Sequence, residues 1–370
     1  MLRVLVDGVI YGAQKFGGIS RCFTETFSRI GNQTGGIEII LHLPPNCQAT
    51  IPKGKWIRKI RDYNIRPQTL FHPLVSRVSK ARAWPLHPQI FHSTYYTLPY
   101  WSGLRTVVTV HDFIYEKYPS LLGDARPFIE QKRRVVEQAD AIVAVSHSTK
   151  RDILEYARVD EAKIAVIYHG VSDAFLAPSH TEDDREGFRE KHKVGNPYWL
   201  YVGPRGLYKN FGTFLRAFIR AARETDGYIV AVGGEVKLES WQVDLLIRNR
   251  LDQRVRLLSE IDDEALRLAY SAAAGFVFPS LAEGFGIPLL EAMACGTPII
   301  ASDIPVFREI AADAALYFHP YDEESLAEAM MQVLEQTTRQ SLVERGRKRV
   351  SEFSWDTASG KLENVYKSLA

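Results

Sequence analysis

The chain has 370 residues, of which 46% are hydrophobic and 24% are charged, and these values are typical of a soluble protein with about two domains. Its formal net charge of +2 gives no global electrostatic argument for nucleic-acid binding. The chain contains no apolar run long enough to span a bilayer. No signal-peptide pattern precedes the first expected strand, so we expect a cytoplasmic protein.

Short apolar runs rich in β-branched residues alternate with longer amphipathic stretches along the whole chain. Runs of this kind, apolar without strict alternation, indicate parallel strands that are buried on both faces. In the first half we expect strands at Leu2–Val6, Ile37–Leu43, Ile90–Phe91, Thr106–Val110, Ala141–Val145 and Ile164–Ile167. In the second half we expect strands at Trp199–Val202, Ile229–Val232, Val255–Leu258, Gly275–Phe278, Pro298–Ala301 and Leu316–Phe318.

This alternation predicts an α/β protein with two doubly wound, Rossmann-like domains facing each other across a cleft. A polar stretch without a strand pattern separates the two sets of strands, and we place a linker there. The expected boundaries are 1–172 for the first domain, 173–197 for the linker and 198–350 for the second domain, followed by a C-terminal helix at 351–370. The three cysteines, Cys22, Cys47 and Cys295, have no metal-site or disulfide spacing, so we expect reduced thiols.

Ligands of open α/β sheets bind beyond the carboxyl ends of the strands, and one loop of this kind is especially informative. Glu283 and Glu291 flank a Gly-Phe-Gly turn, and Pro288 is expected to be the first residue of a short helix. The N–H groups at a helix start attract phosphate, while a carboxylate accepts hydrogen bonds from sugar hydroxyls. The segment therefore has the groups needed to bind a nucleotide sugar.

A second loop, Gly203–Asn210, follows an expected strand and carries two cations, Arg205 and Lys209. Both could point at one anionic ligand and neutralise the charge that builds on a departing diphosphate. The alternative is a helix start with two solvated cations, which is common on protein surfaces.

Two features of the first half are weaker signals. Gly17 and Gly18 would let the backbone approach a ligand closely, although turns are the commoner use of adjacent glycines. His111 follows the strand Thr106–Val110 and could hydrogen-bond a sugar hydroxyl, or could simply be satisfied by nearby backbone. For His147 and His169 we favour the second, structural role.

Several sequence motifs are absent, and their absence excludes some functional classes of protein. The chain has no GxGxxG motif, which argues against a dinucleotide-dependent dehydrogenase. It has neither a D-x-D tripeptide nor a His/Cys cluster at metal-ligand spacing, so we expect neither a metal nor another cofactor.

The interval Lys53–Arg82 combines many basic residues with aromatic and aliphatic ones. Such composition suits an element lying on an anionic membrane face, and equally a solvated basic loop. We therefore expect either a purely cytoplasmic protein or one bound peripherally to the inner face of the cell membrane.

Taken together, these motifs resemble those of the retaining glycosyltransferases of family 4, which have the GT-B fold. The resemblance spans nearly the whole chain, and its most specific element is Glu283–Ala294. The short interval from Arg205 to Lys209 resembles a mannosyltransferase-like subgroup acting in polysaccharide and O-antigen assembly. The supporting elements are Gly17-Gly18, Val110-His111-Asp112, Val145–Ser148 and His169-Gly170-Val171.

The resemblance implies a role for each matching residue. Arg205, Lys209, Glu283 and His111 would act at the transferred sugar and the diphosphate. Glu291 would bind the ribose of the nucleotide. The remaining donor-binding positions implied are Gly17, Gly18, Ser259, Ile261, Gly284, Phe285, Gly286 and Ile287. The first domain would bind the acceptor and the second domain the nucleotide sugar, and the C-terminal helix would pack on the first domain.

The function expected from this resemblance is the retaining, metal-independent transfer of a hexose from a nucleotide sugar. Mannose from GDP-mannose is favoured as donor, and a lipid-linked oligosaccharide or polysaccharide as acceptor. A nucleotide-sugar epimerase of the same architecture and a non-catalytic nucleotide-sugar-binding protein are the alternatives. We expect no nucleic-acid partner.

Overall fold

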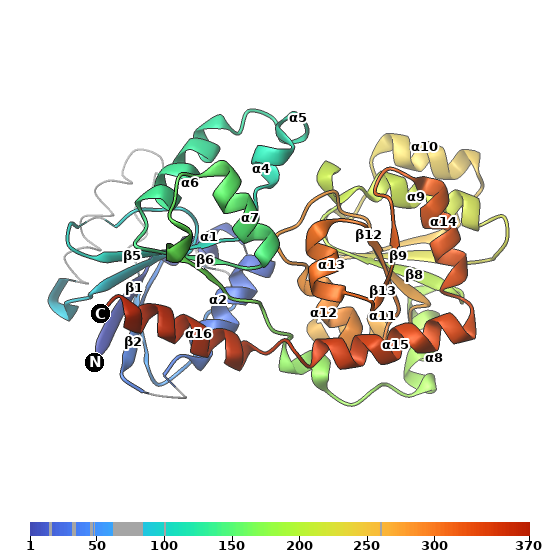
Figure 1. Cartoon of the computed structure of the whole chain (residues 1–370). Coiled ribbons are helices and arrows are strands. Elements are labelled where there is room, and N and C mark those ends of the chain that lie inside the picture. Colours follow the sequence, from blue (N-terminus) through green and yellow to red (C-terminus); the bar gives the residue numbers. More distant parts are fainter. Residues whose placement is uncertain are drawn as a thin grey trace. The chain divides into compact units, whose positions relative to one another are not determined.

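The computed structural model describes residues 1–14, 17–31, 35–44, 47, 49–61, 84–99, 101–259 and 261–370. The chain divides into two compact units. Met1–Pro119, Gly123–Gly170 and Ser354–Ala370 form the first unit, and Ser120–Leu122 and Val171–Phe353 form the second. Figure 1 shows the helices and strands of both.

The first unit is built on a parallel sheet with the strand order β3-β2-β1-β4-β5-β6-β7. Its strands are β1 (Leu2–Val6), β2 (Ile37–Leu43), β3 (Ile57–Arg61), β4 (Ile90–Ser93), β5 (Arg105–Val110), β6 (Ala141–Ala144) and β7 (Ile164–Val166). Its helices include α1 (Val9–Ala13), α2 (Gly18–Arg29), α4 (Ile114–Lys117), α6 (Arg126–Gln138), α7 (His147–Tyr156) and α16 (Trp355–Ser368). Helix α5 (Pro119–Leu122) has its first residue in this unit and its other residues in the second.

Successive residues of β5 belong to two separate cores of this unit. Val107 packs with residues of α2 and α16, whereas Val108 packs with residues of α6 and α7. Neighbouring residues of a strand point to opposite faces of the sheet, so both faces are covered by helices. Helix α16 packs along α2 (Figure 1), which makes the last segment of the chain part of the first unit.

The second unit is built on a parallel sheet with the strand order β10-β9-β8-β11-β12-β13. Its strands are β8 (Tyr198–Val202), β9 (Tyr228–Val232), β10 (Val255–Leu258), β11 (Gly275–Phe278), β12 (Ile299–Ser302) and β13 (Ala315–Phe318). Its helices are α8 (Glu182–His192), α9 (Phe211–Ala221), α10 (Ser240–Arg248), α11 (Asp263–Ala272), α12 (Ile287–Ala294), α13 (Pro305–Ala311), α14 (Glu323–Gln332) and α15 (Gln336–Val350).

Two adjacent aromatic residues of β8 show how this sheet is covered. The indole of Trp199 donates to the carbonyl of Met330 on α14 (3.2 Å), and the hydroxyl of Tyr198 donates to the carbonyl of Ala269 on α11 (2.6 Å). Both side chains are completely buried. Each brings its polar atom to a helix carbonyl, so burial of these rings leaves neither donor unpaired.

The expected architecture is confirmed: each half of the chain forms a doubly wound parallel sheet, and each expected strand is present. Strand β3 was not expected. Its sequence, Ile-Arg-Lys-Ile-Arg, lacks a buried apolar run because it is the edge strand of its sheet, where charged side chains reach solvent. It falls within Lys53–Arg82, most of which lies outside the described residues.

The interval 173–197, assigned to a linker from its polarity, belongs to the second unit and contains helix α8. Thr181 and Asp184 form a capping box at the start of this helix, which packs on α11. A surface helix that buries little more than Phe188 gives a weak apolar pattern, and this explains why the sequence alone suggested a linker.

Candidate functional site

The loop between β11 and α12 carries the glutamate-rich segment singled out in the sequence. It ends at Gly286, whose φ of 100° is a backbone conformation that favours glycine. Helix α12 then begins at Ile287, one residue before Pro288. Its buried residues include Leu289 and Leu290, which anchor the helix start in the second unit.

Glu283 lies in this loop and forms an ion pair with Lys209 from a different loop. Lys209 Nζ is 2.5 Å from Glu283 Oε1, and the side chains are 12% and 13% exposed. The hydroxyl of Ser280 also donates to Glu283 Oε1, at 2.7 Å. The short helix Leu207–Lys209 after β8 supplies the lysine, and the segment after β11 supplies the acid. Adjacent strands β8 and β11 thus bring together two residues that are 74 positions apart.

Glu291 is buried on α12, with 5% of its surface exposed. Tyr270 on α11 donates its hydroxyl to Glu291 Oε2 at 3.1 Å. A buried carboxylate needs such donors, because an ion without them loses its hydration uncompensated. Neither Tyr270 nor Ser280 was singled out from the sequence, since a Tyr or Ser within an apolar stretch gives no pattern of its own.

Arg205 binds backbone carbonyl groups in the described structure. Its guanidinium donates to the carbonyl of Gly233 at 2.9 Å and to that of Glu235. Burial lowers the pKa of Arg205 from its ordinary value. The two cations of this loop therefore have different partners, a carboxylate for Lys209 and the β9–α10 loop for Arg205.

The remaining expected donor-binding residues of the second unit lie on the same sheet edge. Ser259 and Ile261 follow β10, just before Asp262, which caps α11 by accepting from the Ala265 N–H at 2.8 Å. Ser259 is exposed and Ile261 is half-buried. Gly284, Phe285, Gly286 and Ile287 lead into α12.

In the first unit, Gly17 caps α2 and Gly18 is its first residue. The carbonyl of Gly17 accepts from the Arg21 N–H at 3.0 Å and from the Ser20 hydroxyl at 3.1 Å. A Cβ on Gly17 would lie 2.3 Å from the side-chain oxygen of Gln14. The glycine pair therefore lies at the hydrogen-bonded start of α2.

His111 is buried at the carboxyl end of β5, with 6% of its surface exposed. Its backbone N–H donates to the Tyr96 hydroxyl at 3.4 Å, and its ring meets Phe23 edge-on. Its ring Nε2 makes no hydrogen bond to any described residue. Burial, reinforced by neighbouring His169 and His92, lowers the pKa of His111 well below its ordinary value, so the ring is neutral.

The other histidines differ in their surroundings. His147 is exposed at the start of α7, whereas His169 is buried with its Nδ1 3.4 Å from the Cys22 sulfur. His92, which the sequence analysis did not single out, is fully buried within β4. It bonds the hydroxyls of Tyr366 (2.5 Å) and Thr109 (2.9 Å).

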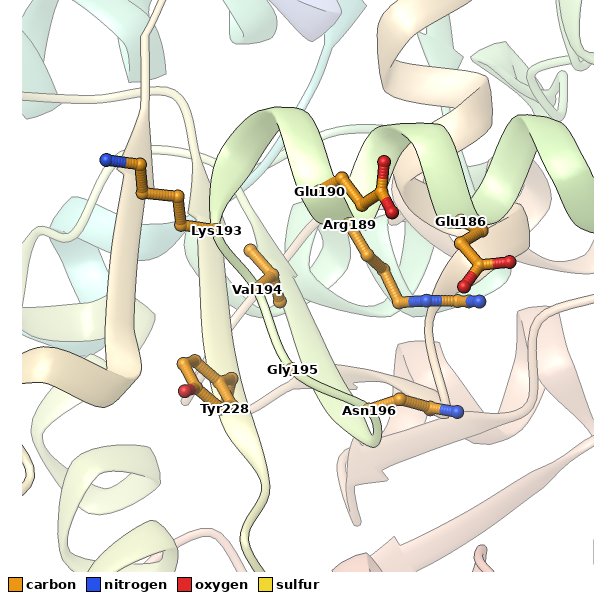
Figure 2. Close-up of a pocket in the computed structure, with 8 residues that line it drawn as sticks. All are labelled: Glu186, Arg189, Glu190, Lys193, Val194, Gly195, Asn196 and Tyr228. Carbon is orange, nitrogen blue, oxygen red and sulfur yellow. The ribbon is translucent and has the colours of Figure 1, made fainter.

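A shallow hollow of about 390 Å³ lies elsewhere in the second unit (Figure 2). It is formed at the end of α8, where Asn196 and Tyr228 precede or begin strands β8 and β9. The expected site residues of this unit follow the carboxyl ends of β8, β10 and β11, so the hollow lies at the opposite edge of the sheet. It contains none of those residues, and we do not assign it to the donor. Its lining residues are Glu186, Arg189, Glu190, Lys193, Val194, Gly195, Asn196 and Tyr228.

Two doubly wound parallel sheets, with charged residues beyond the carboxyl ends of their strands, are the architecture of the GT-B glycosyltransferases. A family model described as Glycosyltransferase Family 4 matches residues 16–175, and one described as Glycosyl transferases group 1 matches residues 182–349. The chain belongs to glycosyltransferase family 4 and resembles its O-antigen mannosyltransferases.

The relatives of known description support this assignment. The O-antigen chain mannosyltransferase RfbU of Salmonella typhimurium is 32% identical over 65% of this chain and 64% of its own length, so the alignment spans slightly less than two thirds of that relative. O-antigen chain mannosyltransferase B of Escherichia coli is 27% identical over 82% of this chain and 80% of its own length.

Solved structures agree on the fold. Anabaena HepE in complex with UDP-glucose superposes with a TM-score of 0.77, covers all of both chains and is 16% identical. At this identity the likeness concerns the fold alone.

Proposed function

We propose that this chain is a retaining, metal-independent glycosyltransferase that moves a hexose from a nucleotide sugar to a growing glycan. The observation that carries the proposal is the Lys209–Glu283 pair next to the start of α12. A cation, a carboxylate and the start of a helix at one place suit a ligand that combines a diphosphate with sugar hydroxyls.

In this mechanism the second unit holds the donor. Glu291, kept in place by Tyr270, accepts hydrogen bonds from the ribose. Lys209 and Arg205 neutralise the diphosphate as the bond to the sugar breaks, an electrostatic contribution that is often the largest in enzyme catalysis. Glu283 contacts the transferred sugar, and the departing phosphate oxygen takes the acceptor's proton on the same face. A double displacement on an enzyme nucleophile is the other route to retention.

We favour mannose as the sugar, because the relatives RfbU and mannosyltransferase B are described as O-antigen mannosyltransferases. GDP-mannose is accordingly the donor we propose. A lipid-linked oligosaccharide or polysaccharide would be the acceptor, at the inner face of the cell membrane. None of the helices in the described part of the chain is both long and apolar enough to cross a bilayer.

A thermal-shift panel of UDP-, GDP- and ADP-sugars tests the donor, because a ligand that binds the native state raises its apparent stability. We expect GDP-mannose to give the largest shift, with no requirement for added divalent metal. No shift with any member of the panel would contradict the proposal.

Incubation with the donor alone separates the alternative functions. A transferase releases free sugar and nucleoside diphosphate slowly, whereas an epimerase converts the donor into its epimer. A non-catalytic binding protein would bind the donor tightly and leave it unchanged even with a lipid-linked glycan present.

A further inference from the structure

A cluster of aromatic side chains lies at the carboxyl edge of the first sheet and contains none of the residues expected to bind the donor. Tyr95 follows β4, Tyr115 lies on α4 after β5, and Phe128 lies on α6. Strands β4 and β5 are hydrogen-bonded neighbours and parallel, so the segments that follow them meet at one edge of the sheet. The ring centroid of Phe128 is 4.9 Å from that of Tyr115 and 5.6 Å from that of Tyr95.

These three rings are half-buried, in contrast to the fully packed rings of the core. Tyr96 is buried and packs against the cluster, with its ring centroid 5.7 Å from that of Phe128. Neither Tyr95 nor Tyr115 uses its hydroxyl in a hydrogen bond to any described residue. An aromatic surface with free hydroxyl groups at its rim thus remains accessible.

Asp112 adds a carboxylate to the same place. Its Oδ1 accepts from the Ile114 N–H at 3.2 Å, while Oδ2 accepts no hydrogen bond from the described residues. Burial, together with the nearby charges of Tyr115 and Asp112, raises the pKa of Tyr95 to about 12. Asp112 also follows His111 directly.

The backbone beneath this cluster is fixed by a buried lysine. Lys132, with 1% of its surface exposed, donates to the carbonyl of Asp112 at 2.6 Å and pairs with Glu116 at 2.9 Å. Its ammonium also lies 4.0 Å from the ring centroid of Phe113. A lysine neutralised in this way supplies no free cation for a phosphate.

We propose that Tyr95, Tyr115, Phe128 and Asp112 form a subsite that binds a neutral sugar ring of the acceptor. The C–H face of a pyranose packs on aromatic rings, and its hydroxyls pair with phenol and carboxylate oxygens. The carboxylate disfavours a phosphate at the same place. The subsite rests on the proposed transferase function and adds to it that the acceptor is recognised through a sugar residue.

Saturation-transfer NMR of the full chain with mannobiose, galactobiose and cellobiose tests this subsite. We expect at least one disaccharide to bind, and Tyr115→Ala to weaken it about five- to tenfold, the range of one aromatic contact. Tyr115→Phe and Asp112→Asn, which keep the shape, should weaken it about two- to fivefold, as for a lost hydrogen bond. Trp56→Leu is the matched control. This change removes a half-buried ring of the same unit. Trp56 directly precedes the edge strand β3, which β2 and β1 separate from β4 in the sheet, so disaccharide binding should be unchanged.

Thermal shift with GDP and UDP, measured on the same proteins, reports the donor site independently. Failure of all three disaccharides to bind, or equal binding by wild type and Tyr115→Ala, overturns the subsite. If binding depends on Tyr115 while no nucleotide or nucleotide sugar binds, the subsite stands and the proposed transferase function fails.

Discussion

Lys209 and Glu283 form a close ion pair, with Nζ 2.5 Å from Oε1, although 74 residues separate them in the chain. Both side chains are nearly buried, so each compensates the charge of the other. The ring centroids of Phe278 and Tyr208 lie 5.6 and 5.2 Å from the lysine ammonium. The pair places a cation and a carboxylate at the segment that leads into α12.

Replacing either partner of this pair should abolish most of the transferase activity. We expect Lys209→Ala and Glu283→Ala each to reduce kcat by about 100-fold. Lys209→Ala removes the proposed stabilisation of charge on the departing diphosphate, and Glu283→Ala removes the carboxylate proposed to accept hydrogen bonds from the transferred sugar. Initial rates with the true donor and acceptor measure this effect. Lys348→Ala, an exposed lysine on α15 of the same unit, is the control and should keep wild-type rates. Near wild-type rates in both site variants would show that this pair is not part of the active site.

The Tyr270–Glu291 hydrogen bond predicts a specific effect on donor affinity. Tyr270→Phe removes only the hydroxyl, which donates to Glu291 at 3.1 Å, and loss of a hydrogen bond to a charged group costs about 1.5–3 kcal/mol. Calorimetric titration should therefore show a donor Kd raised by about tenfold or more. Affinity equal to wild type would mean that the Tyr270 hydroxyl does not contribute to donor binding.

Arg205 should restrain the loop between β9 and α10. Arg205→Lys keeps the charge, but a single ammonium cannot reproduce the fork of donors that bonds the carbonyls of Gly233 and Glu235. We expect faster proteolytic cleavage at residues 233–239 and kcat lowered by about tenfold. Arg248→Lys on α10, an exposed arginine, provides the comparison. Identical cleavage rates in the two variants would contradict this role.

The buried histidines predict that stability falls in mild acid. Burial lowers the pKa of His92 and of His169 to about 3, whereas an unfolded histidine has a pKa of about 6.5. Below pH 6.5 the unfolded chain therefore binds protons that the folded chain does not. Stability is greatest above pH 6.5 and is lost as the pH falls toward 3, by about 2 kcal/mol per histidine at pH 5.

Urea unfolding between pH 7.5 and 5 measures this dependence. His92→Gln should lower the stability at pH 7.5 but flatten its dependence on pH, since the replacement does not titrate. His147→Gln, at an exposed histidine, should leave the dependence as in wild type. A flat profile in the wild-type protein would contradict the prediction.

A side chain at position 170 should clash with the start of α16. A Cβ at Gly170 would lie 2.3 Å from the backbone nitrogen of Trp355, so Gly170→Ala must displace the start of α16. We expect it to destabilise the first unit by about 1–3 kcal/mol. Gly187→Ala is the matched control, because its Cβ meets nothing within 4 Å and it lies within α8. Alanine should stabilise that helix by about 0.5–1 kcal/mol, and equal unfolding midpoints in the two variants would contradict both expectations.

Much of the fold could be predicted because parallel strands buried on both faces leave uninterrupted apolar runs. The strands Leu2–Val6 and Gly275–Phe278 were expected with the observed bounds. The edge strand β3 and the surface helix α8 were not, since each is mostly exposed and has little apolar pattern.

The candidate site could be predicted only in part. Glu283, Glu291, Arg205 and Lys209 were identified individually, because charged residues at strand ends are visible in a sequence. Their partners were not, because hydrogen bonds to Tyr270 and to the carbonyls of the 233–237 loop depend on which segments lie side by side.

The sequence by itself determined the two parallel sheets and the loops that carry charge, because burial and turn formation leave a local pattern of residue types. Only the tertiary structure decided that Lys209 pairs with Glu283, that Arg205 binds carbonyl groups, and that Tyr95, Tyr115 and Phe128 form one cluster. These contacts join residues far apart in the chain, and the order of strands in each sheet, which brings them together, is not encoded in any single segment.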